Sequence, residues 1–180
     1  SMLAYSQRSK LSPEVLNLNA VVARFVDEHN SPKHPLIAEL ADGLGPISAD
    51  RRLLETALQH LISNARDAMP QGGDIRIVTE TITHGFTDDR NFVTPLSPGC
   101  YICLSVQDFG VGMSPEALQQ VFDPFYTTKA VGQTAGMGLG LSISYGIVQS
   151  FGGQIKGINT GNGAQFSVTL ERAKPLEKAA

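Results

Sequence analysis

A carboxylate followed by two closely spaced glycines, in Asp108-Phe109-Gly110-Val111-Gly112, is the first group that could carry chemistry. It follows an apolar stretch, residues 101–107, that is typical of a strand. A carboxylate at a strand end can accept a hydrogen bond from the exocyclic amine of adenine, and glycine lets the backbone lie close to the base. Asp-x-Gly is also common in turns, so Asp108 alone fits either a ligand site or a turn.

A second glycine run, Gly136, Gly138 and Gly140, opens a helix that is predicted over 138–151. Glycines at this position expose backbone N–H groups and let a phosphate approach the positive end of the helix. The spacing G-x-G-x-G differs from the dinucleotide-binding and P-loop patterns, and a hinge beside a tightly packed helix is the alternative. Lys129, in the loop before this run, could reach a phosphate if the loop folds over the site, or could stay solvated.

Three polar side chains, His60, Asn64 and Asp67, recur at helical spacing along a helix that is predicted over 49–68. They lie along the edge of its apolar face, where polar groups need partners. The amide oxygen of Asn64 could ligate Mg²⁺ whose charge is compensated by phosphates, or it could satisfy a backbone group. His60 taken alone is more typical of a structural histidine.

Hydrophobic periodicity and breaker residues predict the elements that must position these side chains. The predicted helices cover 17–30, 49–68 with Ser48 as N-cap, a short stretch from Pro115 with Ser114 as N-cap, and 138–151. The predicted strands cover 36–41, 74–83, 101–107, 154–160 and 164–170. Strands that pair mostly as hairpins, with helices between them, favour a two-layer α/β sandwich over a doubly wound fold.

The bulk composition is that of an ordinary globular domain and excludes several classes of protein. The chain has 180 residues, 42% of them hydrophobic, and a formal net charge of −3. No apolar run reaches the roughly 18 residues of a membrane span, and no Lys/Arg cluster favours nucleic-acid binding. Cys100 and Cys103 form C-x-x-C, but an offset of three on a strand places them on opposite faces. With no framework of disulfides, a reducing cytoplasm is favoured.

Taken together and in this order, the segments resemble the four boxes of a known family. The match covers about residues 14–171 and resembles the ATP-binding catalytic domain of bacterial sensor histidine kinases, in the superfamily of gyrase, Hsp90 and MutL. Two of its sequence motifs, Asn-Ala-Arg-Asp-Ala-Met and Phe-Tyr-Thr-Thr-Lys, are similar to those of the nitrogen-regulation-like subgroup. The corresponding segments are Leu61–Met69 (N box), Asp108–Gly112 (G1 box), Val121–Lys129 (F box), Gly136–Leu141 (G2 box) and the closing hairpin Gly161–Phe166.

The resemblance implies a fold and a role for each segment. The fold would be a mixed, mostly antiparallel sheet of about five strands with about three helices on one face. Asp108 would bind the adenine amine, Asn64 would hold Mg²⁺, and residues 123–137 would form a lid over ATP. His60 and Asn64 would be the catalytic residues. The full set of implied ATP-binding residues is Asn64, Asp67, Asp108, Gly110, Gly112, Tyr126, Thr127, Thr128, Lys129, Gly136, Met137, Gly138, Leu139, Gly140 and Leu141.

Three positions depart from the family pattern. Position 60 is Asn in many of these kinases and Glu in the related hydrolases, where Glu activates water; here it is His60. A contact to metal or phosphate and a packed ring are both open for this residue. Met137 and Ala164 each replace a frequent Thr, so one hydrogen bond on the adenine side is either missing or made by water.

The resemblance also implies the domain organisation and partners. Residues 1–13 would be a cloning remnant and the end of a preceding dimerisation helix, 14–172 the catalytic domain, and 173–180 a tail. The partners would be ATP, the dimerisation and phosphoacceptor domain of the same protein, and a response regulator receiver domain. The full-length protein would be a homodimer, either cytoplasmic or the cytoplasmic part of a membrane-bound sensor. An ATP-hydrolysing domain and a non-catalytic interaction module are the alternatives.

The phosphoacceptor pattern H-[ED]-x-x-[NT]-P surrounds none of the four histidines, His29, His34, His60 and His84. We therefore expect the isolated chain to bind adenine nucleotides without phosphorylating itself. Incubation with radiolabelled ATP, followed by alkaline gel electrophoresis, is the measurement. An acid-labile phosphohistidine on this chain would contradict the expectation.

Overall fold

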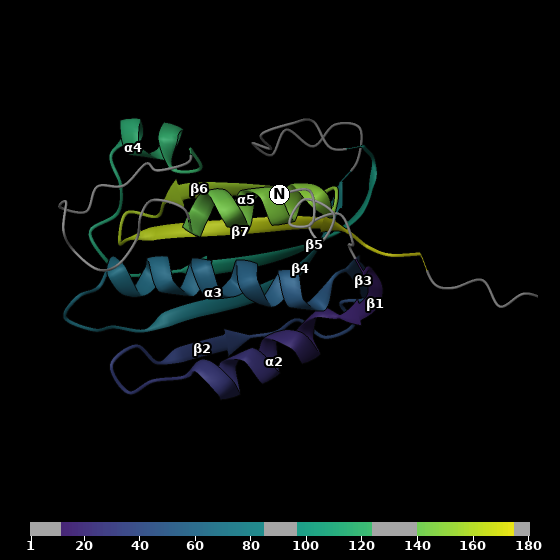
Figure 1. Ribbon diagram of the computed structural model, residues 1–180, viewed down its shortest axis with the longest axis horizontal. Helices are drawn as coiled ribbons and strands as arrows, with labels where there is room; N and C mark the ends of the chain where they lie inside the picture. Colours follow the sequence, from purple (N-terminus) through teal and green to yellow (C-terminus); the bar gives the residue numbers. More distant parts are fainter. Residues whose placement is uncertain (1–11, 85–96, 124–139, 175–180) are drawn as a thin grey trace, which may run out of the picture.

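A five-stranded sheet organises the chain. The computed structural model describes residues 12–84, 97–123 and 140–174, and within them the sheet has the order β2-β4-β5-β7-β6 (Figure 1). β2 runs parallel to β4, and the other neighbouring pairs are antiparallel. The strands are β2 (Leu36–Glu39), β4 (Ile75–His84), β5 (Gly99–Gln107), β6 (Gln154–Asn159) and β7 (Ala164–Glu171).

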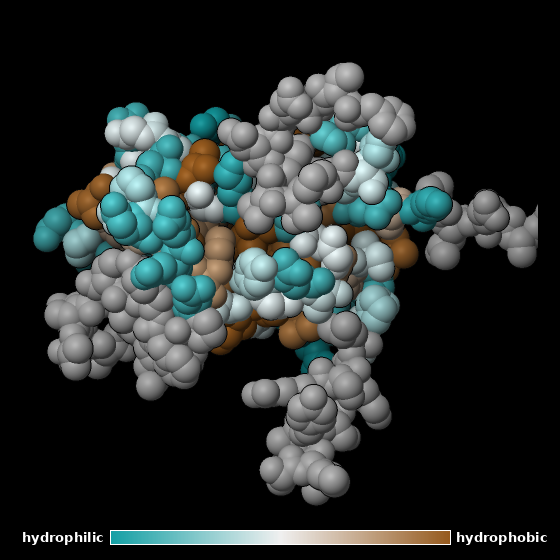
Figure 2. All heavy atoms as spheres, turned by 90° about the horizontal axis from the view of Figure 1, so that it is seen from above, coloured by the Kyte–Doolittle hydropathy of each residue, from teal (hydrophilic) through white to brown (hydrophobic). Residues whose placement is uncertain are grey.

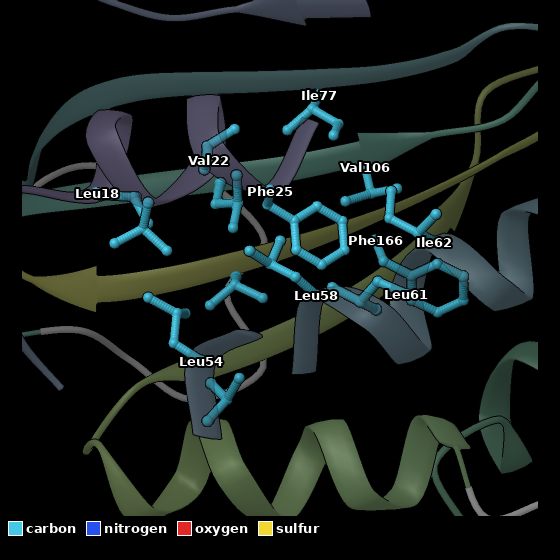
Figure 3. Close-up of a cluster of buried hydrophobic side chains, with 14 of the residues drawn as sticks. Leu18, Val22, Phe25, Leu54, Leu58, Leu61, Ile62, Ile77, Val106 and Phe166 are labelled. Atoms are coloured by element: carbon cyan, nitrogen blue, oxygen red, sulfur yellow. The ribbon is translucent and has the colours of Figure 1, made fainter. Parts of the chain in front are cut away.

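Three helices cover one face of this sheet, as the resemblance implied. They are α2 (Leu18–His29), α3 (Arg51–Asp67) and α5 (Gly140–Ser150), and they lie in front of the strands in Figure 1. Alternate residues of the central strands point toward the helices because side chains alternate along a strand. In Figure 3, Phe166 of β7 lies among Leu61 and Ile62 of α3 and Val106 of β5. The predicted two-layer sandwich is therefore confirmed.

The predicted elements are confirmed with small shifts of their ends. β4 and β5 are longer than expected at the ends that flank 85–96, and β2 is shorter. Ser114 caps α4 (Pro115–Gln120) as predicted, because its Oγ accepts a hydrogen bond from Ala117 N at 3.1 Å. Most of the loop expected over 123–135 lies outside the described residues.

A small second sheet, which the sequence did not predict, corrects the start of α3. β1 (Glu14–Asn17) pairs antiparallel with β3 (Pro46–Ala49), so Ser48 lies within a strand and the prediction that it caps the helix is wrong. The chain stays extended through Ala49 because it pairs with Glu14. The N-cap is instead Asp50.

Asp50 connects the residues before β1 to α3, the helix that carries His60, Asn64 and Asp67. Its Oδ1 accepts hydrogen bonds from Arg52 N at 3.0 Å and Leu53 N at 3.3 Å, and its Oδ2 accepts one from Ser12 N at 3.0 Å. The residue is only 4% exposed. The N–H group of Ser12, with those of Leu53 and Arg52, favours the charged form and lowers the pKa of Asp50.

The two cysteines of β5 lie three residues apart, so their side chains point to opposite faces of the sheet. Cys100 is exposed, Cys103 is buried, and both are free thiols, as expected from their offset of three. Seen from above in Figure 2, hydrophobic residues are exposed at the surface in several separate areas, which is normal for a folded domain. Among the described residues, no helix has both the length and the apolar character needed to cross a membrane.

Replacing Asp50 by Asn is expected to destabilise the fold by about 0.5 to 2 kcal/mol at neutral pH, because an amide has one acceptor oxygen where the carboxylate uses two. The lowered pKa means that the carboxylate contributes fully above about pH 3.9 and less as the pH falls through the folded pKa. Urea unfolding at pH 7, 5 and 3 is the measurement. The difference in free energy of unfolding between wild type and variant should become smaller only at pH 3. Asp27→Asn, on the exposed side of α2, is the control and should change little. A difference of equal size at pH 3 would contradict the account.

Candidate nucleotide-binding site

Asp108 lies at the end of β5 with its carboxylate held by the neighbouring strand and its own loop. Oδ1 accepts hydrogen bonds from Gly110 N at 3.0 Å and Ala164 N at 3.2 Å, and Asp108 N donates to Ala164 O at 2.9 Å. The residue is 2% exposed. Within the described part of the chain no donor contacts Oδ2. The carboxylate is thus fixed in orientation with one oxygen left to accept from a ligand.

The turn between β6 and β7 packs directly against Asp108. A Cβ at Gly163 would lie 2.2 Å from the carbonyl oxygen of Asp108, and Gly163 has a φ of 154°. No other residue type fits that approach without moving the strand end. The closing hairpin therefore forms one wall of the site, and Ala164 contributes through its backbone.

The other wall comes from the end of α3. A Cβ at Gly110 would lie 2.2 Å from Ala68 O, the carbonyl of the residue that caps this helix. Farther along the loop, Asn159 at the end of β6 accepts from Met113 N at 2.8 Å and donates to Met113 O. Loop 108–113 is therefore held between α3 on one side and the β6–β7 hairpin on the other.

The first turn of α5 meets α3 at His60. A Cβ at Gly140 would lie 3.2 Å from His60 Nδ1, and Ser144 Oγ donates to Ala57 O at 3.1 Å. Partial burial lowers the pKa of His60, which favours the neutral form of its imidazole. In its neutral form His60 can offer a hydrogen bond near the start of α5 but no positive charge.

Asn64 lies one turn beyond His60 and one turn before Ala68. Residues at i, i+4 and i+8 share one side of a helix, so the three positions follow each other over about 12 Å. The Asn64 side chain is half-buried and forms no hydrogen bond with the described residues. Asp67 is also half-buried, at the last turn of α3. The α3 helix thus connects the Asp108 loop to the start of α5, with an amide between them.

The structure places only part of the predicted set. Gly140 begins α5 and Leu141 is packed against the core. The other predicted residues of the lid and glycine run lie outside the described residues: Tyr126, Thr127, Thr128, Lys129, Gly136, Met137, Gly138 and Leu139. Asn159 was not predicted to take part. Its only signal in the sequence is its place two residues before the turn Gly161-Asn162-Gly163.

The proteins to which this chain is similar belong to the family that its four sequence motifs suggested. Residues 49–174 match the family of histidine kinase-, DNA gyrase B-, and HSP90-like ATPases. The chain therefore belongs to this family, and its fold is that of an ATP-binding domain of this kind. Sensor kinase CckA of Brucella abortus (strain 2308) is 36% identical over 179 residues, which are 95% of this chain and 18% of CckA. The chain spans less than a fifth of the length of the first curated relatives that it matches.

Solved structures share the fold. The histidine kinase ThkA, in complex with the response regulator protein TrrA, superposes with a TM-score of 0.69 at 24% identity, covering 96% of this chain and 45% of that one. Full-length ShkA in complex with AMPPNP gives a TM-score of 0.68 at 22% identity, covering 95% of this chain and 34% of that one.

Two glycine-to-alanine substitutions should act in opposite directions. Gly110→Ala places a methyl group against Ala68 O and is expected to cost about 1 to 3 kcal/mol of stability. Gly146→Ala, in the exposed face of α5 with no atom near its Cβ, is expected to stabilise by up to about 1 kcal/mol. Chemical denaturation of both variants is the measurement. Equal effects of the two substitutions would show that Gly110 is not closely packed.

Proposed function

We propose that this chain is the ATP-binding catalytic domain of a two-component sensor histidine kinase. It would present the γ-phosphoryl group of ATP to a histidine on the dimerisation domain of the same protein. The observation that supports this best is the arrangement along α3. A fixed carboxylate lies beside one end of the helix, an amide lies in the middle, and the start of a second helix lies beside His60.

The adenine end of the site would be defined by Asp108. Because Oδ1 is occupied by two backbone N–H groups, Oδ2 is the oxygen that would accept from the 6-amino group. Gly110 and Gly112 would let the base lie against the backbone of the loop. A purine with a carbonyl at this position would place two acceptors together and would be rejected.

The phosphate end would lie between Asn64 and the first turn of α5. Mg²⁺, when bound with the nucleotide, would neutralise phosphate charge, and Asn64 would supply one of its oxygen ligands. Gly136, Gly138 and Gly140 would offer backbone N–H groups to the phosphates. Lys129, Tyr126, Thr127 and Thr128 would act from a lid over 123–137, with Met137, Leu139 and Leu141 beside the glycines. Asp67 would border the same end of α3.

Transfer to a histidine suits this site better than hydrolysis. Phosphoryl transfer relies mainly on positioning and charge neutralisation, so the domain needs no strong base. A neutral imidazole at position 60 would hold a hydrogen bond near the phosphates without the carboxylate that activates water in the related hydrolases. His60 and Asn64 would therefore position the reacting group rather than create the nucleophile.

The partners follow from the same proposal. The phosphoacceptor histidine would come from the dimerisation domain that precedes this chain, with 1–13 as its end, 14–172 as the catalytic domain and 173–180 as a tail. The full-length protein would be a homodimer, located in the cytoplasm or on its side of a membrane. A receiver domain would take the phosphoryl group onward. The ThkA–TrrA complex supports a partner of this kind, and the ShkA complex with AMPPNP supports the nucleotide.

Asp108→Asn should invert the choice of base. The variant keeps an oxygen for the Gly110 and Ala164 N–H groups but turns a donor toward the ligand. We expect ADP affinity to fall about 30- to 100-fold, while inosine diphosphate, which carries a carbonyl, binds the variant better than ADP does. Calorimetry with both nucleotides is the measurement, and Asp27→Asn is the control. A wild-type chain that binds neither nucleotide would instead favour a non-catalytic interaction module.

Asn64→Ala should remove the part of the affinity that depends on Mg²⁺. ADP binding with Mg²⁺ is expected to weaken at least about tenfold, and binding in EDTA should stay close to that of wild type. Ser63→Ala, exposed on the same helix, should behave as wild type in both conditions. If Mg²⁺ changed the ADP affinity of the variant as much as that of wild type, Asn64 would not be a ligand of the metal.

A further inference from the structure

We propose that His34 is a positioning residue for the base-binding loop and acts on Asp108 through Met69. This inference rests on the proposed function, because it assumes that loop 108–110 recognises adenine. His34 belongs to the connection between α2 and β2 and lies outside every motif considered above. The structure connects it to the site by a short series of contacts.

His34 is anchored on the turn that follows α3. The residue is 8% exposed, and its Nε2 donates to Met69 O at 2.8 Å, because a carbonyl can only accept. The backbone around it is bound to the same turn and to the start of β4, since Gly73 N donates to Lys33 O at 3.0 Å and Ile75 N donates to Pro35 O at 2.9 Å. The ring is therefore held in place and in turn holds the carbonyl of Met69.

Met69 carries this restraint to the loop. Its side chain is buried, and Sδ accepts a hydrogen bond from Phe109 N at 3.4 Å. The preceding carbonyl, Ala68 O, lies against Gly110. Both residues that follow Asp108 are thus in contact with the turn that His34 anchors.

The position of these two residues decides how the carboxylate points. Gly110 N is one of the two donors that hold Asp108 Oδ1, so a shift of Gly110 would release or reorient the carboxylate. A histidine that only fills the core would affect stability and leave the choice of base unchanged. A positioning histidine would affect the choice of base as well.

The experiment compares binding of ADP and inosine diphosphate to His34→Leu, which has no donor, and His34→Gln, whose amide can replace Nε2–H. His29→Leu is the matched control, because the His29 ring contacts α2 itself, through Nδ1 and Phe25 O at 3.0 Å. The selectivity is the ratio of the two dissociation constants, and the melting temperature is measured in parallel. We expect His34→Leu to lower the selectivity about three- to tenfold and His34→Gln to restore it. His29→Leu should lower the melting temperature and leave the selectivity unchanged.

Selectivity that stays at the wild-type level in His34→Leu would overturn the proposal, whatever its melting temperature. If that variant does not fold, Met69→Leu decides, because it keeps the volume and removes the sulfur acceptor. It should lower the selectivity at least about twofold, and unchanged selectivity would again overturn the proposal. A wild-type chain that binds ADP no better than inosine diphosphate would refute the proposed function itself and not only the role of His34.

Discussion

The carboxylate of Asp108 is the group on which the site depends. It lies at the end of a central strand, and two backbone N–H groups from separate segments hold the same oxygen. A buried carboxylate is costly unless such donors satisfy it, so the strand end, the loop and the closing hairpin must keep their positions together. The glycines at 110 and 163 make this possible because any side chain there would collide with backbone oxygens. The proposed recognition of the base would thus depend on the backbone of the sheet and its loops.

The α3 helix relates this carboxylate to the rest of the site. One end of the helix supports the loop after Asp108, and its middle contacts the first turn of α5. Its N-terminus is connected through Asp50 to Ser12, two residues before β1. Asp50 thus bonds Ser12 to the helix that carries His60 and Asn64.

Much of the fold could be predicted because its long elements have clear periods. The helix predicted over 49–68 and the strands predicted over 74–83 and 101–107 each bury one side in the core. Their hydrophobic patterns are therefore clear. The strands β1 and β3 were not predicted, because each has four residues and neither is an apolar run bounded by breaker residues, as β2 is by Pro35 and Asp42-Gly43. The start of α3 was wrong for a related reason: Ser48 and Asp50 are both good caps, and only the pairing with β1 decides between them. The contact of Met69 with Phe109 joins residues that are 40 positions apart, and no sequence pattern around either residue indicates it.

The most direct test of the account is a crystal structure of this chain with ADP and Mg²⁺. The account predicts that the 6-amino nitrogen of adenine lies about 3 Å from Asp108 Oδ2, while Oδ1 keeps its bonds to Gly110 and Ala164. It also predicts that the phosphates lie between Asn64 and the first turn of α5. A base bound elsewhere, or an adenine that contacts loop 108–112 without reaching Oδ2, would contradict it.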